Sequence, residues 1–347
     1  MLSERIEGKW IDAFARAFEL SHVRPGDAVA ILSETLSRQV NVHLSELALL
    51  RLRARPFHLV LPTPPQTVDI PIRSTGASVA IGGSEPVLKA LCEGTMVVDL
   101  TVEGLMHAKE LPRILKSGSR VLYVSNEHPE ILERLGPDPA LKPGFEDAVR
   151  RIKAASEMRV VSEAGSDLRI DLRRAAVGGG WGAVERPGQL DHWPSGVVVA
   201  FPRAGTVNGK LAMAPGDLNL TFKRAIERPI ALRIENDYVV AVEGEGHDAE
   251  LMRSYFAAWG DREAYATSHV GWGLNPRARW DAVALYDKGD FNGVEQRCFA
   301  GNFLYSTGAN EFAKRYTLGH FDLPLRGHSV TLDGQAMIER GALCPIA

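Results

Sequence analysis

Short apolar runs separated by helix-like segments are the feature that most constrains the fold of this chain. The apolar runs cover residues 28–32, 57–61, 96–100 and 120–125. Segments with helical spacing of apolar residues lie at about residues 1–22, 37–55, 86–91 and 105–116. Alternation of strand and helix patterns predicts a mostly parallel sheet covered by helices.

The pattern changes after about residue 155. Residues 159–163 and 167–172 alternate between apolar and polar, as half-exposed antiparallel strands do. Further strand patterns at 197–201, 231–235 and 238–242 are followed by a helical segment over 247–259. A chain of 347 residues is long enough for two domains. We therefore expect an α/β domain over residues 1–157 and an α+β, metal-binding catalytic domain over residues 158–347.

Composition narrows the functional classes. The formal net charge is −3 and the isoelectric point is about 6.4, which argues against nucleic acid or an anionic membrane surface as a partner. The three cysteines are far apart and form no CxxC pair. The N-terminal residues are charged and resemble no signal peptide, and no apolar stretch has the length of a membrane span. These features predict a cytoplasmic protein.

His320-Phe-Asp322 is the candidate centre of a functional site. In an extended chain, residues i and i+2 point to the same face, about 7 Å apart along the strand. Two histidines and one carboxylate are the protein ligands of non-haem Fe(II) oxygenases. The alternative for so short a pattern is a buried histidine bonded to a structural aspartate.

Other catalytic motifs are missing from the sequence. No GxSxG elbow, no HExxH pair and no GxGxxG after the first strand is found. His269 lies 51 residues before His320, between small polar residues and a glycine-rich turn. A lone histidine of this kind is more often a hydrogen-bonded core residue than a ligand, so its interpretation depends on a partner.

The second half of the chain resembles a known family. Residues 193–211, 269–276, 300–308, 320–322 and 330–334 look like blocks of the thermophilic-type metallo-aminopeptidases. The resemblance implies an aminopeptidase-like fold. Those enzymes hold two metal ions on glutamates, histidines and an HxD pair.

The departures from that family change the expected chemistry. Val197 and His269 align where the peptidase glutamates belong, and Leu304 aligns with a peptidase histidine. This set cannot hold two metal ions. His269, His320 and Asp322 remain, and they suit one Fe(II) with open positions.

That combination is similar to the 2,5-dihydroxypyridine 5,6-dioxygenases, ring-opening enzymes of nicotinate and nicotine catabolism. The resemblance extends into the first half through residues 98–107. A Leu-His pair guides and hydrogen-bonds the substrate in that family, and here the pair is Met106-His107. Methionine and leucine are flexible apolar side chains of similar size, so we expect Met106 to form the same apolar wall of the substrate pocket as the leucine.

The resemblance also implies that a serine is a further metal ligand, and Ser306 is the best match, with Thr307 beside it. Ser306 and His107 each have an alternative interpretation. Ser306 would otherwise cap a turn, and His107 would otherwise be an ordinary helix residue.

The implied activity is Fe(II)-dependent opening of the C5–C6 bond of 2,5-dihydroxypyridine by O2, giving N-formylmaleamate, with His107 sharing a substrate proton. The alternatives are a metallo-aminopeptidase-like hydrolase and an inactive member that acts as a binding protein. The family also implies a homo-oligomer such as a hexamer.

Overall fold

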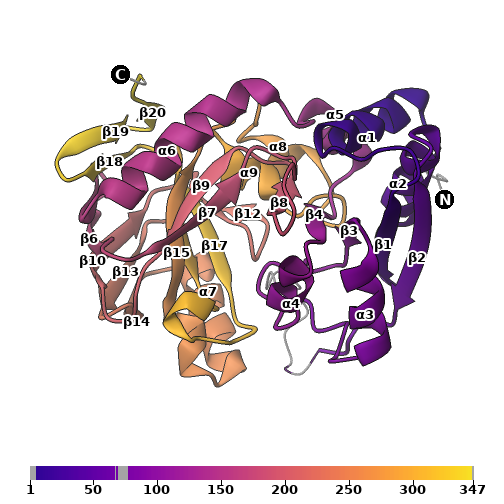
Figure 1. Ribbon diagram of the computed structural model, residues 1–347. Helices are drawn as coiled ribbons and strands as arrows, with labels where there is room; N and C mark the ends of the chain where they lie inside the picture. The colour runs from indigo at the N-terminus through magenta and orange to yellow at the C-terminus, as the bar shows by residue number, and fades with distance from the viewer. Residues whose placement is uncertain (1–4, 67, 69–76, 346–347) are drawn as a thin grey trace.

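The computed structural model describes residues 5–66, 68 and 77–345. These residues form one parallel sheet, two large antiparallel sheets and a small two-stranded antiparallel sheet. In Figure 1 the first half of the chain and its parallel sheet lie on the right, and the antiparallel sheets lie on the left. α6 (Lys142–Ala154) runs along the top of the second half. The expected α/β part followed by an α+β part is therefore confirmed as a fold class.

The first sheet is parallel throughout and has the order β2-β1-β3-β4-β8. Parallel strands need crossover connections, which the helices provide. α1 and α2 pack on one face through Phe14, Phe18 and Leu49, and α3 and α4 pack on the other through Leu91 and Ile114. The elements are β1 (Ala28–Glu34), β2 (Arg55–Leu61), β3 (Met96–Leu100), β4 (Arg120–Val124), β8 (Leu190–Trp193), α1 (Gly8–Leu20), α2 (Gln39–Arg51), α3 (Glu85–Glu93), α4 (Leu111–Lys116) and α5 (Pro129–Arg134).

An eight-stranded sheet forms the outer layer of the second half, in the order β14-β13-β10-β6-β5-β18-β19-β20. Its inner face and α7 (His247–Trp259) enclose the largest apolar core, which includes Leu211, Met252 and Phe256. The strands are β5 (Glu157–Ser162), β6 (Asp167–Asp171), β10 (Val207–Met213), β13 (Ile230–Glu235), β14 (Tyr238–Gly244), β18 (His328–Leu332), β19 (Gln335–Glu339) and β20 (Ala342–Leu343).

The third sheet carries three of the predicted site residues, His269, Ser306 and Asp322, and has the order β17-β16-β15-β9-β7. Its neighbouring strands are antiparallel. They are β7 (Ala176–Gly180), β9 (Val197–Phe201), β15 (Thr267–Gly273), β16 (Phe303–Thr307) and β17 (Phe321–Leu325). Smaller elements are β11 (Leu218–Asn219), β12 (Arg224–Ala225), α8 (Ala282–Leu285), α9 (Val294–Cys298), and the 3₁₀ turns η1 (Pro139–Leu141), η2 (Arg262–Tyr265) and η3 (Glu311–Ala313).

Strand pairing crosses the expected division at residue 157. β8 lies in the second half of the chain, yet it pairs in parallel with β4 of the first sheet. Trp193 of β8 is fully buried against Phe14 of α1, with ring centroids 4.8 Å apart. The division into 1–157 and 158–347 stays a prediction, and any boundary must account for this returning strand.

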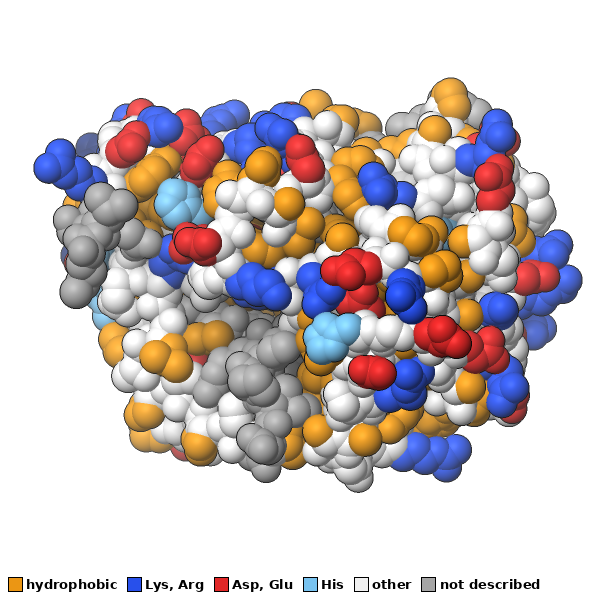
Figure 2. Space-filling view, turned by 180° about the vertical axis from the view of Figure 1, so that it is seen from behind, with side chains coloured by type: hydrophobic (Ala, Val, Ile, Leu, Met, Phe, Trp, Pro, Cys, Tyr) orange, Lys and Arg blue, Asp and Glu red, His pale blue; other side chains and the backbone are white. Residues whose placement is uncertain are grey.

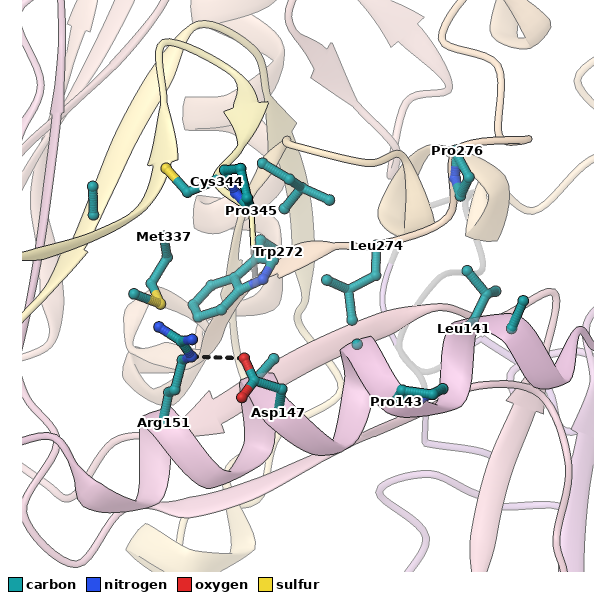
Figure 3. A pocket seen from close by; sticks show the side chains of 15 residues that line it. Leu141, Pro143, Asp147, Arg151, Trp272, Leu274, Pro276, Met337, Cys344 and Pro345 are labelled. Carbon is teal, nitrogen blue, oxygen red and sulfur yellow. Dashed lines mark hydrogen bonds and ion pairs between the residues drawn. The ribbon is translucent and has the colours of Figure 1, made fainter. Parts of the chain in front are cut away.

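The surface agrees with the near-neutral charge. On the face in Figure 2, basic and acidic side chains are interspersed rather than gathered by sign. No helix in the described ranges has the length and hydrophobicity needed to cross a bilayer. An apolar groove of about 310 Å³ lies between α6 and the C-terminal strands, where Trp272, Leu274 and Met337 line it (Figure 3).

Buried polar contacts hold the two halves together near the site. The Glu127 carboxylate, after β4, accepts hydrogen bonds from the backbone N–H groups of Asn292 (2.7 Å) and Val294 (2.9 Å). Arg134 of α5 forms a two-fold ion pair with Glu295 of α9, at 2.5 and 2.9 Å. α9 is therefore anchored to the first half at its N-terminal end.

Replacing Glu127 by alanine is expected to lower the free energy of unfolding by about 2–4 kcal/mol, because two backbone N–H groups lose their acceptor. Denaturant unfolding of the full chain measures this. Glu163→Ala, on the exposed turn between β5 and β6, is the control and is expected to change stability by less than about 0.5 kcal/mol. Equal stabilities of the two variants would contradict the anchoring role.

Candidate functional site

His320 and Asp322 meet at the start of β17. His320 immediately precedes the strand and Asp322 is its second residue. The distance from His320 Nε2 to Asp322 Oδ2 is 3.0 Å, and both residues are about 4% exposed. The i and i+2 spacing therefore places the imidazole and the carboxylate together, as the sequence predicted.

Ser306 faces Asp322 across the neighbouring strand. The two residues are paired in the β16–β17 ladder, and the Ser306 hydroxyl donates a hydrogen bond to Asp322 Oδ1. Thr307 pairs instead with Phe321, and its hydroxyl accepts from the Phe321 backbone N–H at 3.1 Å. Of the two adjacent hydroxyls, only that of Ser306 is bonded to the Asp322 carboxylate in the described part of the chain.

His269 approaches Asp322 from β15. Its Nε2 lies 3.8 Å from Asp322 Oδ1. The Ser268 hydroxyl donates its proton to the Ala309 carbonyl, so its oxygen accepts from Nδ1–H of His269 at 3.0 Å. This leaves a lone pair on Nε2, which faces the carboxylate. Burial lowers the pKa of His269 to about 3, so the ring is neutral near pH 7.

One nitrogen of His320 lacks a partner. Nδ1 is buried and has no hydrogen bond within the described residues. The backbone carbonyl of His320, in contrast, accepts two hydrogen bonds, from the hydroxyls of Tyr255 (2.9 Å) and Thr221 (3.0 Å). Nε2, and not Nδ1, is the nitrogen of His320 that faces the Asp322 carboxylate.

Asp322 is also paired with Arg297 of α9, whose Nε lies 2.5 Å from Oδ2. Burial raises the pKa of Asp322, but the charges of Arg297 and His320 outweigh this and hold that pKa well below its usual range. The carboxylate is therefore ionised, as a metal ligand is.

His107 enters the site from the first half of the chain. The sequence predicted a helix over 105–116, but α4 begins only at Leu111, so this prediction was too long at its start. Residues 101–110 form turns, because the Asp99 carboxylate accepts from the backbone N–H groups of Thr101 (3.0 Å) and Leu105 (2.7 Å). Burial raises the pKa of Asp99 to about 6. Met106 lies half-buried in the same turn.

Three imidazoles surround one space. The ring centroid of His107 lies 6.3 Å from those of both His269 and His320, which are 6.1 Å from each other. Nδ1 of His107 lies 3.2 Å from Oε2 of Glu311, in η3. Phe201 adds an aromatic wall, with its ring 5.4 Å from that of His269.

The sequence did not identify four residues of this arrangement. Arg297 and Glu311 lie in short helical turns without any motif, and nothing local marks them. Phe201 belongs to an ordinary apolar strand. Ser268 had a local signal, since it adjoins His269 in a polar stretch.

The donor set suits a metal ion, although the side chains are paired with one another. No three His, Cys, Asp or Glu side chains of the described ranges are gathered closely enough to form a coordination shell as they stand. Asp322 is bonded to Ser306, Arg297 and His320 instead. Two imidazoles, an ionised carboxylate and a hydroxyl nevertheless fit a single divalent transition metal.

Val197 and Leu304, which the sequence analysis aligns with peptidase ligands, lie in an apolar setting. Val197 and Leu304 pack together with Val199, Val294 and Cys298 in one buried cluster. An unpaired metal ion would be unfavourable there, so the structure offers no second metal site at these positions.

Comparisons with known proteins place the chain in a family. The family model for 2,5-dihydroxypyridine 5,6-dioxygenase (NicX) matches residues 9–345. The 2,5-dihydroxypyridine 5,6-dioxygenase of Pseudomonas putida is 35% identical over 332 residues, which is 94% of each chain. The solved structure of 2,5-dihydroxypyridine dioxygenase from the same species superposes with a TM-score of 0.91 at 33% identity, covering 97% of both chains.

A second solved structure, wild-type AmpT from Thermus thermophilus, has a TM-score of 0.64. It is 15% identical and covers 97% of this chain and 99% of its own, a likeness of fold alone. The family model and the 35% sequence identity both point to the dioxygenases, and this chain belongs to the 2,5-dihydroxypyridine 5,6-dioxygenase family.

Proposed function

We infer that this protein opens the ring of 2,5-dihydroxypyridine between C5 and C6 with O2. The observation that carries the inference is the convergence of His269, His320 and Asp322, opposite His107, in a member of this dioxygenase family. The product would be N-formylmaleamate, which contains both oxygen atoms of O2. The ring supplies all the electrons, so the reaction needs no nicotinamide or flavin.

We propose that His269, His320 and Asp322 hold one Fe(II), with the Ser306 hydroxyl as a weaker ligand. Nitrogen and carboxylate ligands that leave open positions are typical of non-haem iron oxygenases. Bound Fe(II) would supply a binding site for O2 and a path for electrons from the ring.

The chain's own residues prepare this site. Ser268 fixes the His269 tautomer so that Nε2 is free, and Arg297 keeps Asp322 ionised. His107 would accept the phenolic proton of the substrate, which makes the ring a better electron donor. Met106 would contribute to the pocket wall beside it.

The hydrolase alternative has less support. The likeness to AmpT is one of fold, and Val197 and Leu304 are packed in an apolar cluster. The family also supports proposals of a cytoplasmic enzyme of pyridine catabolism and of a closed homo-oligomer such as a hexamer.

Oxygen uptake tests the proposed activity. After anaerobic loading with Fe(II), the protein is expected to consume O2 and 2,5-dihydroxypyridine in equal amounts, with loss of the pyridine absorbance. Iron that is bound without any uptake would reject this substrate. Hydrolysis of an amino-acid arylamide after loading with Co(II) or Zn(II) would favour the hydrolase instead.

The iron content of alanine variants distinguishes the proposed metal ligands from the proposed base. His269→Ala, His320→Ala and Asp322→Ala are expected to lose iron and activity together, because each removes a donor. His107→Ala is expected to keep its iron while kcat falls by about 10²–10⁴, the usual contribution of a general base. Iron is measured by elemental analysis after gel filtration. A His107→Ala variant with full activity would show that its assigned role is wrong.

The adjacent hydroxyls provide a matched pair. Ser306→Ala is expected to weaken iron affinity by about 10–100-fold, the size seen when a supporting group of a metal site is lost. Thr307→Val removes a hydroxyl that bonds the Phe321 backbone, so it is expected to reduce stability and leave iron affinity unchanged. Titration of the metal-free proteins with Fe(II) distinguishes them, and the reverse order of affinities would assign the ligand to Thr307.

A further inference from the structure

The contact between His107 and Glu311 joins the two halves of the chain directly over the site. His107 belongs to the turns after β3, and Glu311 belongs to η3, after β16. Their side chains are 6% and 33% exposed, and Nδ1 lies 3.2 Å from Oε2. The imidazole is therefore buried, and the carboxylate is only partly exposed to solvent.

The segment that presents Glu311 is fixed at its base. Asn310 and Arg315 exchange backbone hydrogen bonds of 3.0 and 2.9 Å, which closes a short loop. The Asn310 amide donates to the carbonyls of Pro202 (2.9 Å) and Ser268 (3.0 Å). The loop is thus attached to the residue that precedes His269.

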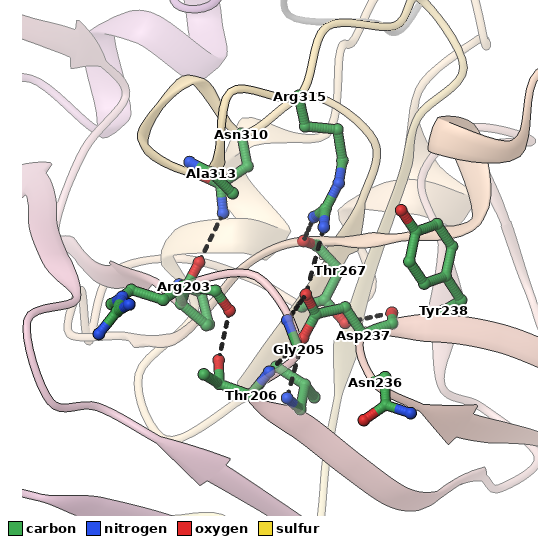
Figure 4. Close-up of polar contacts among 12 residues, drawn as sticks. Arg203, Gly205, Thr206, Asn236, Asp237, Tyr238, Thr267, Asn310, Ala313 and Arg315 are labelled. Carbon is green, nitrogen blue, oxygen red and sulfur yellow. Dashed lines mark hydrogen bonds and ion pairs between the residues drawn. The ribbon is translucent and has the colours of Figure 1, made fainter.

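Arg315 anchors the other end of the loop. It is 5% exposed and donates to Glu263 (2.8 Å), the Thr267 carbonyl (2.8 Å) and Asp237 (3.2 Å). Figure 4 shows Arg315 and Asn310 side by side above the strand that bears Thr267, with Asp237 beneath. A carboxylate carried by so constrained a loop can hold its partner in one orientation.

The chemistry of the contact follows from the two partners. A carboxylate only accepts hydrogen bonds, so the shared proton lies on Nδ1 of His107. In neutral imidazole the other nitrogen, Nε2, then has the lone pair. Without an acceptor at Nδ1, both tautomers would be populated and the ring would be free to turn.

We propose that Glu311 is a positioning residue for His107, which holds the imidazole in the tautomer whose Nε2 accepts the substrate proton. This inference rests on the proposed function, in which His107 is the base. Glu311 would act through His107, and within the described residues it has no side-chain hydrogen bond to His269, His320 or Asp322.

A double-mutant cycle tests this relation. Glu311→Ala is expected to lower kcat by about 10–100-fold, with little change in KM and with unchanged iron content. In a His107→Ala background the same substitution is expected to have no further effect, because its target is already absent. Glu311→Gln is expected to recover part of the loss, since its amide oxygen still accepts from Nδ1. The control is Glu163→Ala, which removes a carboxylate from an exposed turn.

The tautomer of His107 can also be measured directly, independently of activity. Long-range ¹H–¹⁵N spectra of the metal-free full chain, assigned by comparison with His107→Ala, are expected to show a protonated Nδ1 in the wild type. Glu311→Ala is expected to show a mixture of tautomers, and Glu163→Ala the wild-type pattern.

Two results would overturn the proposal: an unchanged tautomer in Glu311→Ala, or an equal loss of kcat from that substitution with and without His107. Failure of the proposed function looks different. In that case the iron-loaded wild type would not consume O2 with 2,5-dihydroxypyridine, while the nitrogen spectra would still report whether Glu311 holds the ring.

Discussion

The ionised carboxylate of Asp322, buried between Arg297, Ser306 and two imidazoles, is the interaction on which the rest of the site depends. Burying a charge is unfavourable unless partners compensate, and here each partner comes from a different segment. Arg297 is brought in by α9, which is itself attached to the first half through Glu295 and Arg134. Folding of both halves therefore brings together the partners that allow this carboxylate to be buried while it is charged.

Much of the architecture was predictable because it depends on local periodicity. The strands of the parallel sheet and the HxD geometry follow from spacing along the chain, and Asp322 is where an i, i+2 relation to His320 places it. The turn around His107 was not predictable as such, because its backbone is held by the buried Asp99 carboxylate rather than by helical bonds. Arg297 and Glu311 depend on contacts between distant segments, which no single stretch of sequence encodes.

The fold of this chain is shared with AmpT from Thermus thermophilus at 15% identity. A scaffold can be retained while the side chains placed on it differ, so the shared fold does not by itself define the chemistry. Val197 and Leu304, which the sequence analysis aligns with peptidase ligands, lie inside an apolar cluster of this chain.

The returning strand β8 has a consequence for how this protein can be divided. It closes one edge of the parallel sheet with residues encoded well after residue 157. A fragment ending there would expose the unpaired backbone of β4, and open sheet edges promote association with other chains. During synthesis on the ribosome, the first half would likewise wait for Leu190–Trp193 before its sheet is complete.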